Sequence, residues 1–526
     1  MRKFVIILLS VFLSSANLYA QGVDLPEFVI KGVKKVSLPK IEKTKPEFVK
    51  PLSESYFKHK FKPEDFDVTF IAKKDTIITH PFNRKTGYSG RIKAAAGMNT
   101  MPAGEAFVSY ANDNFLVTLS GSGRAIKDYE PYSDKITGGG GFSAKYFLEN
   151  SPSDETFSLF GVDGYGKYYD GKFWMSDNPQ IQRKSVFYNG KAKFERFSSD
   201  KYKIALNLSG REVRLLKENF TENCFGGSGM FEYRISPFLV KANANFLLQT
   251  LIEPIYEKQN YYSANAEAEF KIGEDAYVNF GGSFATLESE NFFYPSLGIR
   301  YELGKYFMLS AQIDGEANLK TNYDYAFANP YYDADDFVNV FRRESNRVTL
   351  AARFNYYDFI FMKLEAFYSV TDGFSYFDDS ARRGIFRVRT LDDVTNTALL
   401  FNADLLYSRF GYFSVKTKFQ NTRLPDGNVA PYSPGIYAAA NYNFIIGNRF
   451  SVTLGAEYFS HFYADIANAR RIEPFANLFV GADYKVSSNL KITLDVNNIL
   501  NRNNYYFPEY KTVPFDVLVG IEYFWK

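Results

Sequence analysis

Residues 514–526 of the 526-residue chain read PFDVLVGIEYFWK, and apolar side chains occupy every second position of this stretch. Such alternation predicts a β-strand with one apolar face and one largely polar face. The apolar face carries Phe515, Val517, Val519, Ile521, Tyr523 and Trp525, and the other face carries Asp516, Leu518, Gly520, Glu522 and Phe524. An apolar face that ends in large aromatic side chains is typical of a strand with lipid on one side and water on the other.

The same alternation recurs along most of the chain from residue 89 onward. Clear examples are residues 202–211, 262–272, 307–316, 450–458 and 490–497. Aliphatic or aromatic side chains on one face and charges on the other do not suit packing between two dry layers. Short turns also alternate with longer polar connections. We therefore predict an all-β fold, a transmembrane antiparallel up-and-down β-barrel of about 22 strands over residues 89–526.

Composition narrows the function classes. Aromatic residues make up 18% of the chain, with 53 Phe and 40 Tyr, so many rings must be buried or face lipid. A lone cysteine excludes an intramolecular disulfide framework, and a net charge of +3 does not indicate a nucleic-acid partner. We find no nucleophile motif and no histidine pair at metal-binding spacing, and the four glycines at 138–141 precede no helix. We therefore expect no enzymatic activity, no cofactor and no metal site.

The N-terminal residues form two further segments. Residues 1–20 combine Arg2 and Lys3 with a short apolar run, which predicts a secretory signal peptide. Residues 21–88 are rich in Lys and Pro, and we expect a periplasmic segment there. Within it, PEFVIK at 26–31 is echoed by PEFVK at 46–50. This repeat is either a pair of extended peptides that a partner adds as a strand, or a surface-hugging linker with accidental similarity.

The end of the chain supports a resemblance to a family. Residues 490–506, LKITLDVNNILNRNNYY, resemble the penultimate strand and the N-L-F-N-x-x-Y signature of TonB-dependent outer-membrane receptors. The alternating strand around Gly520 is similar to the closing strand of that family. The resemblance implies solute binding and transport across the outer membrane of a Gram-negative bacterium, with a TonB-like energy-coupling protein or another periplasmic partner. It also implies a TonB-box-like, partner-binding stretch at Asp24, Leu25, Pro26, Glu27, Phe28, Val29 and Ile30.

Two features depart from the pattern of that family. Lys526 follows the C-terminal aromatic residue, and the segment between the signal peptide and the barrel is too short and too rich in Lys and Pro for a full plug domain. Transport energised through a plug is therefore left open. Because a barrel of about 22 strands has a wide lumen, we expect residues 56–88 to lie in or across its periplasmic mouth.

Two long connections, residues 320–343 and 372–393, combine aromatic rings with carboxylates. Such surfaces suit sugars or cationic ligands, and the run Asp-Ala-Asp-Asp at 333–336 carries the hard oxygen ligands that calcium prefers. The alternative is that both are solvated external loops without a ligand. The candidate ligand residues are Tyr331, Tyr332, Asp333, Asp335, Asp336, Tyr376, Asp378 and Asp379.

Three functions follow from these observations. The leading one is a receptor-type barrel that binds or transports an unknown small solute and has outer-membrane lipid around it. The alternative is a structural or adaptor barrel that docks periplasmic partners through residues 21–88. An outer-membrane enzyme such as a lipase is third, because no serine motif lies near any of the three histidines, His59, His80 and His461.

Overall fold

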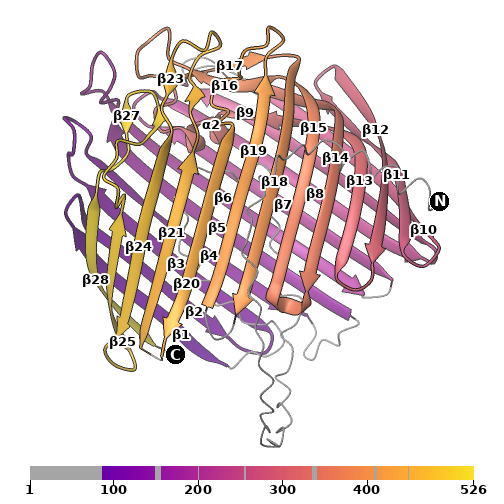
Figure 1. Ribbon diagram of the computed structural model, residues 1–526, viewed down its shortest axis with the longest axis horizontal. Coiled ribbons are helices and arrows are strands. Elements are labelled where there is room, and N and C mark those ends of the chain that lie inside the picture. Colours follow the sequence, from indigo (N-terminus) through magenta and orange to yellow (C-terminus); the bar gives the residue numbers. More distant parts are fainter. Residues whose placement is uncertain are drawn as a thin grey trace, which may run out of the picture. The chain divides into compact units, whose positions relative to one another are not determined.

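Twenty-two antiparallel strands form one sheet that closes on itself, in a computed structural model that describes residues 86–148, 156–198, 201–253, 256–334, 340–407, 411–447 and 449–525. Each strand pairs with its neighbours in chain order. Closure comes from β1, which pairs with β2 on one side and with the last strand, β28, on the other, in a register that runs from Gly90 opposite Trp525 to Gly97 opposite Leu518. The fold class expected from the alternation and the strand number are both confirmed (Figure 1).

Twenty-one of the 22 described strands of the wall have ten or more residues, which is long enough to cross a membrane when tilted. Their bounds are β1 Gly87–Gly97, β2 Thr100–Ala111, β3 Phe115–Ile126, β4 Lys135–Phe147, β5 Thr156–Lys172, β6 Gln182–Ser198, β7 Tyr202–Leu215, β8 Phe220–Ile235, β9 Phe238–Glu253, β10 Glu257–Ile272, β11 Ala276–Leu287, β12 Glu290–Leu303, β13 Phe307–Lys320, β14 Val340–Tyr356, β15 Ile360–Asp372, β18 Val394–Tyr407, β19 Gly411–Arg423, β20 Ile436–Ile446, β21 Phe450–Phe459, β24 Phe475–Lys485, β25 Leu490–Asn497 and β28 Asp516–Trp525. In the described part of the chain, no helix has both the length and the apolar character that crossing a membrane requires.

The two faces of the wall differ as the alternation predicts. On β28, the outward side chains of Val519 and Ile521 are 55% and 58% exposed, whereas Asp516 and Glu522 are 2% and 7% exposed. On the inner face, the ammonium group of Lys491 donates a hydrogen bond of 2.8 Å to Glu522. The two faces of this strand are therefore oriented as predicted: aliphatic groups point outward from the barrel and carboxylates point into the lumen.

The connections at the two ends of the barrel differ in length. Tight connections such as 112–114, 236–237 and 304–306 form one end, which we call the turn end. The other end, the loop end, carries the long connections, and in barrels of this kind the long connections face outside the cell. These hold a helix and three hairpins whose labels gather at one end in Figure 1: α2 Asn322–Ala328, β16 Phe374–Asp378 with β17 Arg387–Leu391, β22 Phe462–Tyr463 with β23 Arg471–Ile472, and β26 Tyr505–Phe507 with β27 Tyr510–Lys511.

One polar stretch differs from its sequence pattern. Residues 218–223 have the composition of a long external connection, but β8 already begins at Phe220. Glu222 and Asn223 made this stretch look like a loop, although Glu222 occupies an inward position and is buried. Alternation and turn signals also did not predict α2 or the three hairpins, because those elements form against other loops and not from a pattern of their own.

The four glycines at 138–141 lie in β4, as expected for a crowded stretch of the wall. Gly138 pairs with Gly123 of β3, and Gly140 pairs with Gly121 of β3 on one side and with Gly166 of β5 on the other. A Cβ atom on Gly139 would lie 2.7 Å from the carbonyl oxygen of Gly166. The glycines therefore permit a close approach of backbones, and no phosphate-binding loop is present among them.

Substituting Val519 by Arg should lower the free energy of unfolding in lipid vesicles by about 2–4 kcal/mol, because it places a charge against hydrocarbon. The matched control is Leu518→Arg on the neighbouring inward position, which is paired with Asp495. There the guanidinium group faces the lumen beside a carboxylate, and the loss should be much smaller. Equal losses in urea unfolding curves would contradict a lipid-facing outer wall.

Candidate functional site

The long loops pack against one another at the loop end of the barrel. We call this assembly the loop cap and define it as residues 127–134, 173–181, 321–334, 373–393, 424–435, 460–474 and 498–515. One apolar core of the cap consists of Phe173, Trp174, Tyr331, Ile385, Phe386 and Tyr510, all buried. These six residues come from four different loops, so the loops form a single packed body.

Tyr510 is the centre of this core. Its ring stacks on Tyr331 with centroids 3.5 Å apart and meets Trp174 edge to face at 5.1 Å. Its hydroxyl group donates a hydrogen bond of 2.6 Å to the carbonyl oxygen of Gly384. One side chain thus joins the loops that follow β5, β13, β15 and β25.

Backbone pairing ties two of these loops together. Tyr332 and Phe386 form an isolated parallel bridge. The amide of Phe386 donates to the carbonyl oxygen of Tyr331 at 3.0 Å, and the amide of Asp333 donates to Phe386 at 2.6 Å. Because these groups are buried, each bond that broke would leave an unsatisfied donor or acceptor.

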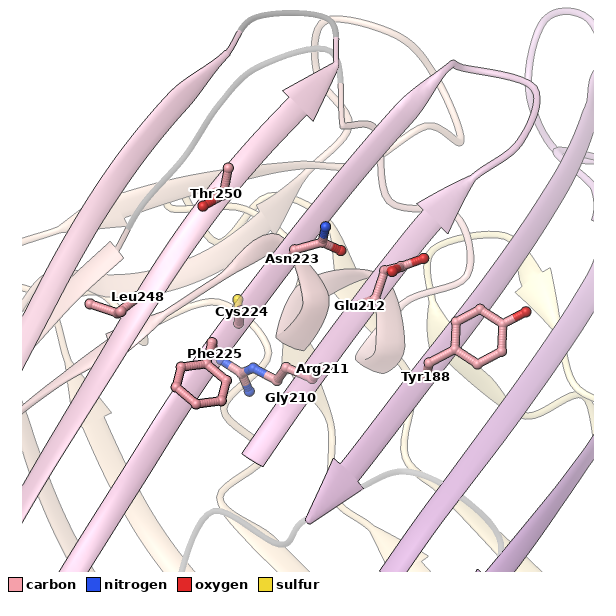
Figure 2. A pocket seen from close by; sticks show the side chains of 9 residues that line it. All are labelled: Tyr188, Gly210, Arg211, Glu212, Asn223, Cys224, Phe225, Leu248 and Thr250. Carbon is pink, nitrogen blue, oxygen red and sulfur yellow. The ribbon is translucent and has the colours of Figure 1, made fainter. Parts of the chain in front are cut away.

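The α2 segment, residues 321–334, packs against the inner face of the wall. Tyr323, Tyr325 and Ala326 of the helix share a buried core with side chains of β6 to β9, namely Phe187, Val213, Leu215, Phe220 and Leu251. Figure 2 looks at β7 and β8 from the membrane side, and a short helix lies behind them. The loop between β13 and β14 therefore folds inward and reaches strands on another part of the wall.

Glu222 of β8 holds the first turn of α2. Its side chain is fully buried, with 0% exposure. Its carboxylate accepts hydrogen bonds from the backbone amides of Asn322 at 3.1 Å and Tyr323 at 2.9 Å, from the Asn322 side chain at 2.9 Å, and from Gln249 at 2.7 Å. A buried carboxylate against the first amides of a helix is favourable because these donors have no partner within the helix.

Arg211 of β7 holds the same turn with the opposite charge. Its guanidinium group donates to Asp324 at 2.8 and 3.3 Å and to the hydroxyl group of Thr321 at 3.1 Å. Asp324 also closes a capping box with Thr321 at the start of the helix. Two charged side chains of the wall therefore hold α2 in place. Glu222 accepts hydrogen bonds from its first backbone amides, and Arg211 pairs with the carboxylate of Asp324.

The candidate ligand residues lie inside this cap. Tyr331, Tyr332, Asp333 and Asp379 are buried, whereas Asp335 and Asp336 fall in 335–339, outside the described residues. Asp333 pairs with Arg382 and Arg387, each at 3.5 Å, and Asp379 pairs with Arg470. Tyr376 and Asp378 are half-buried on β16. A ligand role for these residues stays a prediction, and the geometry gives four of them a role in holding the cap together.

Burial keeps the tyrosine hydroxyl groups of the cap uncharged. It raises the pKa of Tyr331 to about 12, and it also raises the pKa of Tyr510 and Tyr432. These phenols are therefore neutral at physiological pH and serve as hydrogen-bonding groups. The charges of the cap are those of its Arg, Lys, Asp and Glu side chains.

The residues that anchor α2 escaped the sequence reasoning. Arg211, Cys224 and Gln249 are direct neighbours in register on β7, β8 and β9, and Glu222 lies two positions from Cys224 on the same face. A charge at an inward position looks the same in the sequence whether it meets water or another loop. Only the inward fold of residues 321–334 distinguishes Glu222 from the other lumen-facing carboxylates.

A depression lies on the outer surface of β6 to β9, on the opposite side of the wall from α2 (Figure 2). It is lined by Tyr188, Gly210, Arg211, Glu212, Asn223, Cys224, Phe225, Leu248 and Thr250. Tyr188 and Phe225 are half exposed here, while Arg211 and Cys224 turn toward the lumen. The depression therefore lies on the outer surface of the barrel. Across the described ranges, no group of three or more His, Cys, Asp or Glu side chains is arranged to hold a metal ion.

Comparisons with known proteins give matches in structure alone. No protein-family model matches the sequence, and no curated protein sequence matches it. Among solved structures, the FrpB iron transporter from Neisseria meningitidis is similar with a TM-score of 0.63 at 13% identity, over 84% of this chain and 82% of that one. The siderophore receptor PirA from Acinetobacter baumannii gives 0.59 at 11% identity, over 85% and 81%. A mutant of the ferric enterobactin receptor PfeA from Pseudomonas aeruginosa gives 0.60 at 9%, over 84% and 82%.

At these identities the likeness shows the fold. The chain has the barrel of the TonB-dependent receptors, so the resemblance in its last strands is confirmed at the level of the fold. What the neighbours bind is a property of those proteins.

Substituting Glu222 by Ala should release α2 from the wall. The change removes the acceptor of four hydrogen bonds in a buried site, and we expect the local opening free energy to fall by about 3–5 kcal/mol. Hydrogen exchange of residues 322–329 measures this directly. The matched control is Glu232→Ala, on the same strand and the same face but beyond the cap. Unchanged protection in the Glu222 variant would contradict the anchoring role.

Proposed function

We propose that this chain is an outer-membrane barrel of the TonB-dependent receptor type that takes up a small solute through the loop cap. The observation that carries the proposal is the inward fold of the α2 segment onto the lumen wall of a closed 22-stranded barrel. A segment in this position narrows the route between the outside and the lumen. The similarity of the barrel to solved iron and siderophore receptors supports a transport role.

The lumen wall is suited to a hydrated solute. Ion pairs stand along it at several heights, among them Lys93 with Asp495 at 2.8 Å, Arg347 with Asp314 at 2.7 Å and Arg300 with Glu269 at 2.8 Å. Paired charges keep the surface polar and leave little net field. A polar solute that passes the cap would therefore meet a wall that replaces its water contacts without trapping it.

Passage requires the α2 segment to move. Its anchors are two charged residues and a shared apolar core, so leaving the wall exposes Glu222 and Arg211 to incoming water or ligand. A ligand that binds the open cap more tightly than the closed one shifts this equilibrium. The proposed transport cycle is thus a change of position of one loop within a rigid wall.

The second candidate is an adaptor barrel that docks periplasmic partners through residues 21–88. The interlocked core of the cap favours it, because a barrel that conducts nothing can keep its loops permanently packed. The two candidates differ in whether the lumen opens, and conductance distinguishes them.

Replacing residues 321–339 by a four-residue turn should raise the single-channel conductance in planar bilayers. Lys320 and Val340 are paired neighbours in the β13–β14 ladder, so a short turn rejoins the strands without disturbing the wall. Glu222→Ala should raise conductance by a smaller amount, and Glu232→Ala should leave it unchanged. If the loop replacement conducts like the intact chain, the α2 segment does not restrict the lumen.

Deletions in the N-terminal segment test the periplasmic side. Removing residues 21–50 should leave conductance low and abolish capture of a purified TonB-like C-terminal domain, because it removes Asp24–Ile30 and the echoed peptide. Removing residues 21–82 should also raise conductance. These residues lie outside the described ranges, and their placement stays a prediction. Two deletions that conduct and bind like the intact chain would exclude this segment from both roles.

A further inference from the structure

Four arginine–carboxylate ion pairs of the loop cap share one orientation. In each of them the arginine is much more exposed than its carboxylate partner. The side-chain exposures are 47% and 5% for Arg382 and Asp333, 59% and 38% for Arg383 and Glu509, 50% and 19% for Arg389 and Asp378, and 41% and 4% for Arg470 and Asp379. Asp333, Asp378 and Asp379 therefore lie beneath the guanidinium groups, whereas Glu509 is itself exposed, and in all four pairs the arginine is the more exposed partner.

These arginines belong to two loops that lie together. Arg382, Arg383 and Arg389 are in the loop between β15 and β18, and Arg470 is in the loop between β21 and β24. Contact between the loops is direct, because the guanidinium group of Arg470 bonds to Asp379. Arg383 and Arg470 are also close enough to repel each other. Figure 1 shows β17 and β23, which border these residues, at the loop end.

The carboxylates preorganise the arginines. Asp379 has its second oxygen on the amide of Gly384 at 3.2 Å, and Asp378 accepts from the hydroxyl group of Ser380 at 2.8 Å. A guanidinium group held in place loses less conformational entropy when it binds, and its planar fork matches the oxygens of phosphate and carboxylate groups. The acids that suggested a cationic ligand in the sequence therefore serve as supports for cationic side chains.

We propose that this arginine surface, formed by Arg382, Arg383, Arg389 and Arg470, binds an anion that carries two or more phosphate or carboxylate groups. Binding of this anion does not depend on the proposed function. Only its identification as the solute that enters through the cap rests on that function. An anion with one charged group would contact one arginine and would compete with the carboxylate that is already paired with it. Several linked anionic groups span several arginines at once, and the second contact then costs little additional entropy.

One arginine of the same end provides a control. Arg471 pairs with Glu473 at 3.3 Å, and here the acid is the more exposed partner, with 72% against 48%. The positive charge of Arg471 is therefore offset at the surface by a more exposed carboxylate. Lys217, exposed in the short loop between β7 and β8, lies outside the cap. Together they allow a variant with an equal change of charge at the loop end.

The test is binding to the full-length protein in detergent, measured by calorimetry at low salt with tripolyphosphate and with an oligogalacturonate. The variant is Arg382→Gln combined with Arg389→Gln, because their partners keep other donors: Asp333 retains Arg387, and Asp378 retains Ser380. We expect the affinity for the better probe to fall about tenfold. The Arg471→Gln and Lys217→Gln double variant should bind like the unmodified chain, and binding should weaken as salt rises.

The outcomes distinguish a phosphorylated ligand from a carboxylated one. They also distinguish failure of the arginine surface from failure of the proposed transport function. Preference for tripolyphosphate indicates a phosphorylated ligand, and preference for the oligogalacturonate indicates an acidic glycan. Absence of binding by both probes, tighter binding of spermidine, or equal losses in the two double variants would overturn the arginine surface. Because binding in detergent does not require passage, these results are independent of conductance. A heat-modifiability gel of the Arg382→Gln and Arg389→Gln variant, which should shift like the unmodified chain, checks that the barrel is folded.

Discussion

The constraint on which this structure depends is the lack of water in the hydrocarbon core of a membrane. A backbone amide or carbonyl group exposed there is costly, so a sheet that crosses it must have no free edge. The pairing of β1 with β28 over residues 90–97 and 518–525 meets this requirement. With every edge paired, each strand has one face toward lipid and one toward the lumen. The period of two in the sequence is the direct result.

Because the period of two arises from the two different faces of each strand, it determines how much of the fold could be predicted. The alternation is local, so the last thirteen residues already show which side chains of β28 face lipid, and the strand number follows from repeating that reading along the chain. The cap is different because its contacts are remote. Tyr331 stacks on Tyr510, and Glu222 bonds to Asn322, across separations for which the sequence carries no pattern. The loops were therefore located, but their packing and α2 were not.

The candidate site shows a related limit, which concerns exposure. The sequence displays carboxylates and arginines in the loops with equal weight. In the folded cap, Asp333 and Asp379 are buried, and their arginine partners face outward. Which member of an ion pair reaches solvent depends on the layer beneath it, here the aromatic core around Tyr510. The identity of the charged residues was predictable, and the sign of the surface they form was not.

The pairing at the ends of the strands determines which mutations the barrel tolerates. Lys320 and Val340 close the β13–β14 ladder before the α2 segment begins, so the ladder does not depend on what the loop contains. Substitutions, insertions and exchanges of loop sequence can therefore accumulate while the wall continues to assemble. The loop end is therefore the part of the barrel whose alteration least endangers folding.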